Sequence, residues 1–138
     1  MISQKWDANW VIIKTITKID SSWKLIQRRK NMGIFDFWKQ PDINKGLEEF
    51  KAATGAVLVD VRTPEEYQGG HIPGSKNVPL QQLDKIATIA ENKDTVLYVY
   101  CHSGARSRQA AALLQHMGYR HINNIGGIAA YRGKVERL

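Results

Sequence analysis

Residues 95–117 have the sequence TVLYVYCHSGARSRQAAALLQHM. The apolar run at 95–100 predicts a strand buried on both faces, as is typical of parallel sheets. The segment 107–117 predicts a helix, with Gly118 at the C′ position where helices often end. This strand–loop–helix unit places Cys101, the one cysteine of the chain, at the carboxyl end of the strand.

Strands and helices also alternate on both sides of this unit. The residues Thr63-Pro64-Glu65-Glu66 form a capping box that marks the start of one helix. A Thr at the N-cap, a Pro at N1 and a Glu at N3 are each favoured at the start of a helix. Asp42 is the expected cap of another helix. The predicted helices are 43–53, 63–67, 80–90 and 128–132, and the predicted strands are 56–60, 76–79 and 121–124. This alternation predicts a parallel sheet covered on both faces by helices.

Such sheets bind ligands beyond the carboxyl ends of their strands. Two residues with useful side chains occupy such ends in the predicted sheet. Asp60 ends the strand at 56–60, and Cys101 follows the strand at 95–100. We therefore expect the functional site at this edge.

The residues from Cys101 to Arg106 could form an anion-binding loop. Gly104 permits backbone angles that other residues resist, and successive N–H groups in such a loop can surround an anion. The helix that follows adds unpaired N–H groups, and Arg106 can bind an oxyanion through two hydrogen bonds. These groups lower the pKa of a thiol, which makes Cys101 a candidate nucleophile. The alternative is that Cys101 is a small buried apolar residue.

The chain has 138 residues, about the length of one domain. Its formal charge is +7, and most of this charge lies in residues 1–31, with seven basic and two acidic residues. We predict a basic, Trp-rich extension over 1–31 and a single domain over 32–138. The extension could lie on a membrane surface as an amphipathic helix, pack on the domain or a partner, or be accidental, with Met32 as the true start.

A single cysteine excludes an intrachain disulfide and a zinc site built from thiolates. His71 has no partner at metal-ligand spacing, so we predict no metal and no cofactor. No apolar run reaches the ~7–15 residues of a signal peptide or the ~20 of a membrane span, which favours a cytoplasmic location. The near-neutral domain lacks a basic stripe with interleaved aromatics, which argues against nucleic acid as a partner.

Several motifs of the chain resemble those of rhodanese domains. DVRTPEEY at 60–67, with GHIPG at 70–74 and NVPL at 77–80, is similar to the first signature of that family. YVYCHSGARS at 98–107 is similar to its active-site loop, and Gly126-Gly127 matches its closing element. The resemblance covers about residues 42–133, a whole single rhodanese domain. Tyr131 stands where the family often has Trp.

This resemblance implies an α/β fold with a mostly parallel central sheet and helices on both faces. It also implies a thiosulfate:cyanide-type sulfurtransferase. Cys101 would take a sulfane sulfur from a small anionic donor as a persulfide and pass it to a thiol or to a protein acceptor. The implied substrate-binding residues are His102, Ser103, Gly104, Ala105 and Arg106, with Arg106 at the anionic end of the donor. The implied supporting residues are Asp60, Arg62 and Glu66.

Two other functions compete with sulfur transfer. Phosphatases and arsenate reductases of similar fold have five residues between Cys and Arg, whereas four lie between Cys101 and Arg106. The shorter loop suits a persulfide better than the three oxygens of a phosphate. A non-catalytic interaction module is the other alternative, and the presence of Cys101 argues against it, because modules of that kind usually lack the cysteine.

Overall fold

The computed structural model describes residues 41–138. Four strands form one parallel sheet in the order β2-β1-β3-β4. The strands are β1 (Val57–Asp60), β2 (Ser75–Asn77), β3 (Val96–Cys101) and β4 (His121–Gly127). The predictions for residues 1–31 and for Met32 as a start lie outside the described residues.

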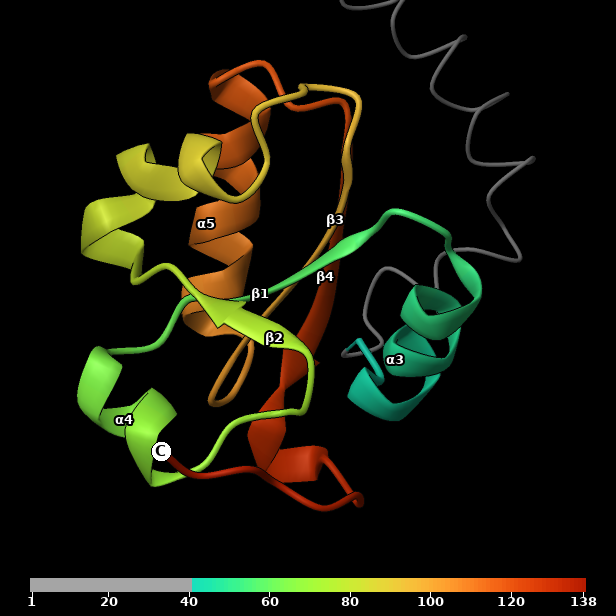
Figure 1. Ribbon diagram of the computed structural model, residues 1–138, viewed down its shortest axis with the longest axis vertical. Helices are drawn as coiled ribbons and strands as arrows, with labels where there is room; N and C mark the ends of the chain where they lie inside the picture. The colour runs from blue at the N-terminus through green and yellow to red at the C-terminus, as the bar shows by residue number, and fades with distance from the viewer. Residues whose placement is uncertain (1–40) are drawn as a thin grey trace, which may run out of the picture. The chain divides into compact units, whose positions relative to one another are not determined.

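Helices cover both faces of this sheet, which confirms the predicted α/β fold. Figure 1 shows α5 (Ala105–His116) and the helical turns η1 (Leu80–Thr88) on one side and α3 (Ile43–Ala52) on the other. The remaining elements are α4 (Pro64–Gly69) and the short η2 (Ile128–Ala130). Each face has its own apolar core. Tyr98 and Tyr100 of β3 lie in the core under α3, and Leu97, Val99 and Cys101 lie in the core under α5.

The two predicted helix caps are confirmed. The side chain of Asp42 accepts a hydrogen bond from the backbone N–H of Asn44 at 3.0 Å. Thr63 and Glu66 form the reciprocal capping box at the start of α4, with Pro64 in its first turn. These caps fix where α3 and α4 begin, and α4 lies directly after the carboxyl end of β1.

The prediction of a regular helix over residues 80–90 is wrong. This segment forms 3₁₀ turns over Leu80–Thr88, and the backbone of Gln82 departs from helical angles. Apolar residues recur here at every third position, from Leu80 through Leu83 and Ile86. A spacing of three matches the 3₁₀ repeat, so the two buried side chains, Leu83 and Ile86, stay on one face. Ala87, which a regular helix would place beside Leu83 on the buried face, is exposed.

The helix that follows the cysteine loop begins two residues earlier than predicted. It starts at Ala105 rather than at Ser107, because Gly104 is the N-cap. Gly104 has a φ of 100°, a left-handed value that glycine adopts without strain. The loop therefore turns sharply at one residue, and Arg106 belongs to the first turn of the helix. The C-terminal signal is confirmed, since the helix ends at His116 and Gly118 also has positive φ.

No helix within residues 41–138 is both long enough and apolar enough to cross a membrane.

Candidate functional site

The carboxyl ends of β1 and β3 bring Asp60 and Cys101 to the same edge of the sheet, as predicted. The two strands are neighbours, and Asp60 pairs in register with Tyr100, the residue before the cysteine. The Val61 N–H donates to the Tyr100 carbonyl at 3.1 Å and extends the pairing by one residue. This edge holds the residues that the sequence singled out.

The cysteine loop is short and closely packed. Cys101 is the last residue of β3 and Ala105 the first of α5, so only His102, Ser103 and Gly104 lie between them. The backbone N–H of Gly104 points back to the cysteine Sγ at 2.9 Å. A nest of this kind can hold an anion at the sulfur position.

Gly126-Gly127, at the end of β4, packs against the backbone of this loop. The Ala129 N–H donates to the His102 carbonyl at 3.1 Å. A Cβ on Gly127 would collide with the backbone of His102 and Ser103, so glycine is required for this close approach. The end of β4 and the residues that follow it therefore fix the position of the loop backbone.

The environment of Cys101 favours its thiolate. The residue is 1% exposed, and burial by itself raises the pKa of the thiol. Hydrogen bonds from the hydroxyl and the backbone N–H of Ser107 outweigh this effect, together with those from the N–H groups of Gly104 and Ser103. The pKa of Cys101 consequently lies below the ordinary value of a cysteine, and more of the thiol is ionised at neutral pH.

Ser107 was not predicted as a site residue, although it touches the nucleophile. Its side chain is fully buried, and its Oγ lies 3.5 Å from the Cys101 Sγ. The same Oγ lies 2.7 Å from the Asn124 Oδ1, which also accepts from the N–H of Gly126 at 3.1 Å. Asn124 is thus fixed as an acceptor. The Ser107 hydroxyl can donate to it, to the Gly104 carbonyl at 3.0 Å or, when Cys101 is ionised, to the sulfur.

Ser107 and Asn124, which were not predicted as site residues, each have a feature in the sequence that could have indicated a role. Asn124 lies between Asn123 and Ile125 at the end of a predicted strand, where a buried polar side chain needs a partner. Ser107 lies one turn into a helix that points at the cysteine. Neither signal names its partner, because Asn124 meets Ser107 only through the pairing of β4 with β3.

We expect Ser107→Ala to raise the pKa of Cys101, because the variant loses the hydroxyl that stabilises the thiolate. A hydrogen bond to a charged group contributes ~1.5–3 kcal/mol, so alkylation at neutral pH should slow about tenfold or more. The measurement is the rate of iodoacetamide addition against pH, followed by intact mass. Ser107→Thr keeps the hydroxyl and serves as the control. An unchanged pH profile in Ser107→Ala would contradict this role.

Arg106 is bound to Glu66, which links the cysteine loop to α4. The Nη1 and Nη2 atoms of Arg106 lie 2.6 Å and 3.0 Å from the Glu66 Oε1 and Oε2. The Arg106 hydrogen bonds lower the pKa of Glu66 to about 2, against the smaller opposing effect of burial. The sequence predicted both residues at the site but not this pairing between them.

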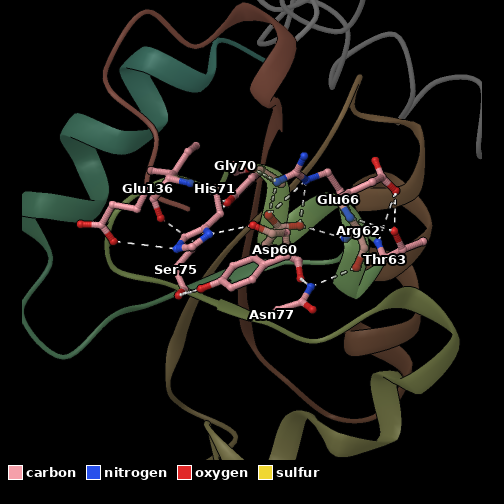
Figure 2. A network of polar contacts seen from close by, with 12 residues as sticks. Asp60, Arg62, Thr63, Glu66, Gly70, His71, Ser75, Asn77 and Glu136 are labelled. Atoms are coloured by element: carbon pink, nitrogen blue, oxygen red, sulfur yellow. Dashed lines mark hydrogen bonds and ion pairs between the residues drawn. The ribbon is translucent and has the colours of Figure 1, made fainter. Parts of the chain in front are cut away.

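Asp60 and Arg62 form a second ion pair, which is buried (Figure 2). The Arg62 Nη2 lies 2.8 Å from the Asp60 Oδ2 and 2.6 Å from the carbonyl of Gly70. Asn77 on β2 donates to the carbonyls of Asp60 and Arg62, both at 3.0 Å. These contacts hold the start of α4 against the ends of β1 and β2.

His71 lies in the same network and is buried. Its Nδ1 is 2.8 Å from the Tyr67 carbonyl, and its ring stacks on the Tyr67 ring. Its backbone pairs with Glu136 in an antiparallel bridge, so the C-terminal segment returns to the end of α4. These contacts give His71 a structural role.

The predicted site residues of the cysteine loop differ in exposure. Cys101 and Gly104 are buried, and Arg106 is half-buried against Glu66. His102, Ser103 and Ala105 are exposed. The exposed residues form the outer surface of the loop.

Comparisons with known proteins agree with this geometry. The family model of the rhodanese-like domain matches residues 42–134. The thiosulfate sulfurtransferase PspE of Escherichia coli is 44% identical over 71 residues, which are 51% of this chain and 68% of that protein. A sulfurtransferase of Allochromatium vinosum is 42% identical over 77 residues, covering 54% of this chain and 70% of that protein. A solved structure described as a rhodanese with anions from E. coli is 37% identical, with a TM-score of 0.57, over 60% of this chain and 99% of that chain.

Proposed function

Because the chain belongs to the rhodanese-like domain family, we propose that it is a sulfurtransferase that carries sulfur as a persulfide on Cys101. The observation that carries this proposal is the position of the sulfur. It lies at the carboxyl end of β3, within hydrogen-bond reach of the Gly104 N–H and the Ser107 hydroxyl. Both groups stabilise negative charge on the thiolate, the form that attacks the donor and that leaves when the acceptor takes the outer sulfur.

In the first step the Cys101 thiolate attacks the sulfane sulfur of the donor. With thiosulfate, a new S–S bond forms to Cys101, and the bond between the sulfane sulfur and the sulfonyl group breaks. The electron pair of that bond leaves with sulfite, so the step needs no external oxidant. Thiosulfate is proposed as a donor because the similar PspE protein is named for it.

In the second step an acceptor takes the outer sulfur of the persulfide. Cyanide would become thiocyanate, and a thiolate would become a persulfide, while Cys101 leaves as the thiolate in both cases. The chain has one cysteine, so a thiol acceptor must come from another molecule. The exposed residues His102, Ser103 and Ala105 are the surface that such an acceptor would meet.

The proposed function is tested by loading the protein with sulfur. Incubation with thiosulfate, followed by intact mass, should show the gain of one sulfur atom that a reductant or cyanide removes. Peptide mapping should place this sulfur on Cys101. A protein that takes up no sulfur from thiosulfate or from any persulfide donor would contradict the proposal. Hydrolysis of an aryl phosphate by Cys101 would favour the phosphatase alternative instead.

The cellular setting of this reaction rests on the sequence alone. A cytoplasmic location and the absence of a nucleic-acid partner stay predictions, as does contact of residues 1–31 with a membrane surface. The acceptor, a small thiol or a protein, is likewise proposed from the chemistry of the persulfide.

A further inference from the structure

Glu66 binds Arg106, the residue that the family resemblance places at the anionic end of the donor. Its carboxylate and the Arg106 guanidinium meet through two parallel hydrogen bonds, the geometry that makes such pairs strong. The side chains of Arg106 and Glu66 are 33% and 34% exposed, so the pair lies at the surface of the site. A donor that approaches Arg106 therefore also approaches the carboxylate.

The carboxylate is fixed from its other side as well. The Glu66 Oε1 accepts hydrogen bonds from the Thr63 N–H at 3.3 Å and the Thr63 hydroxyl at 3.2 Å, as part of the capping box of α4 (Figure 2). Movement of the carboxylate out of this position would break its hydrogen bonds with Thr63, which are one half of the capping box. The pKa of Glu66, lowered to about 2 by its hydrogen bonds with Arg106 in the first place, keeps the group ionised at every pH of an ordinary assay.

The charges around the nucleophile then decide which donors are favoured. The Arg106 pKa is raised chiefly by Glu66, with a further contribution from the charge of Cys101, so guanidinium and thiolate interact electrostatically. Glu66 offsets the charge of Arg106, so the thiolate is stabilised by its hydrogen bonds rather than by a free cation. A guanidinium has five N–H donors. Glu66 takes two of them and leaves three that a donor can use.

We infer that Glu66 is a specificity-determining residue that weakens the use of doubly charged sulfur donors relative to singly charged ones. This inference rests on the proposed function and adds the donor class that the site prefers. Arg106 still orients the anionic head of the donor, and Glu66 limits how much negative charge that head can carry. Donors with a single charge at the reacting group, such as an organic persulfide or a thiosulfonate, are favoured by this arrangement.

Two donors isolate the effect of charge. Thiosulfate carries two negative charges, and methanethiosulfonate carries one, while both contain a sulfane sulfur bound to a sulfonyl sulfur. In each case the thiolate forms a bond to the sulfane sulfur, and sulfite or methanesulfinate leaves with the electron pair. The quantity to measure is the ratio of kcat/KM for thiosulfate to kcat/KM for methanethiosulfonate, with cyanide as the acceptor.

Glu66→Gln should raise this ratio about fivefold, because the second charge of thiosulfate no longer meets the carboxylate. Most of the change should appear in the KM for thiosulfate. Gln at the N3 position preserves a capping box, so the variant removes charge with little change in shape. Glu65→Gln is the matched control, since it makes the same charge change on an exposed neighbouring residue.

Arg106→Gln provides the opposite test. It leaves Glu66 facing the donor without its partner, so the ratio should fall. Because loss of the cation alone lowers the ratio, the role of Glu66 is tested by adding Glu66→Gln to this variant: the ratio should rise again, and no rise would contradict the role of Glu66.

The outcomes separate the inference from the function on which it rests. Failure of the wild-type protein to take sulfur from either donor would overturn the proposed function. Loading from both donors, with a ratio that Glu66→Gln leaves unchanged or that Glu65→Gln raises equally, would overturn the role of Glu66 alone. A rise confined to Glu66→Gln, with a fall in Arg106→Gln, is the expected result.

Discussion

Cys101→Ser should abolish sulfur transfer, with a fall in thiosulfate-to-cyanide turnover on the order of 10⁴-fold or more. Serine keeps the size of the side chain and can accept the hydrogen bond that the Gly104 N–H donates to sulfur at 2.9 Å. It cannot form a persulfide, and its hydroxyl is a weak nucleophile at neutral pH. The measurement is the initial rate of thiocyanate formation.

The thermal unfolding of the same variant is the control for this result. Cys101 lies in the core under α5 with Val99 and Ala110, and a hydroxyl there can donate to the neighbouring serine, Ser107. We therefore expect a folded variant that unfolds within a few degrees of the wild type. Turnover that persists in folded Cys101→Ser would show that sulfur passes directly from donor to acceptor without a protein persulfide.

The sequence predicted the position of the nucleophile because local rules determine it. A buried apolar strand, a glycine and a helix follow one another from Val96 to His116, and parallel sheets place such junctions at their carboxyl edge. The capping box at Thr63 was predictable for the same reason, since its two partners are three residues apart. Contacts of this kind join residues only a few positions apart in the sequence.

Contacts between distant segments were not predictable in the same way. Arg106 was expected to face a donor, and the structure pairs it with Glu66, 40 residues away. The charge of Arg106 is visible in the sequence, but its partner depends on how α4 lies across the end of β1. Asn124 is a similar case, because its contact with Ser107 requires β4 to pair with β3.

The boundary of α5 shows how one backbone angle changes the site. A helix from Ser107 would leave Arg106 in a flexible loop, whereas the left-handed Gly104 starts the helix at Ala105. Arg106 consequently projects from a fixed first turn toward α4. The sequence contained the glycine that makes this possible but not the angle that it adopts.

Asp60→Asn should destabilise the domain by ~3–5 kcal/mol, the usual cost of removing one partner of a buried ion pair. The side chain of Asp60 is 0% exposed and that of Arg62 is 6% exposed. Water therefore cannot hydrate the Arg62 guanidinium once its partner carboxylate is gone. The Nε of Arg62 lies 3.1 Å from both carboxylate oxygens, and an amide would present an N–H group to one of these donors. A loss of this size is a large share of the ~5–15 kcal/mol that stabilises a typical domain.

The surface pair of Asp94 and Arg120 is the matched control. The Arg120 Nη1 and Asp94 Oδ1 atoms are 2.6 Å apart, closer than the 2.8 Å between Nη2 and Oδ2 in the buried pair, but the Asp94 side chain is 55% exposed and the Arg120 side chain 66%. Exposed pairs of this kind contribute ~0–1 kcal/mol, so Asp94→Asn should change the free energy of unfolding by about that amount. Equal effects in the two variants would show that distance, and not burial, sets the contribution of the pair.

A double variant identifies the cause of the loss at Asp60. If an unpaired buried guanidinium is what destabilises Asp60→Asn, then adding Arg62→Met should restore part of the stability, because a neutral side chain of similar length needs no partner. Urea unfolding of the single and double variants measures this recovery. No recovery would place the cost in the backbone contacts instead, where the Asp60 Oδ1 accepts from the Arg62 N–H at 2.9 Å. The same pair anchors α4, and with it Glu66. Recovery of stability without recovery of donor selectivity would therefore show that the pair stabilises the domain and positions Glu66 by separate contacts.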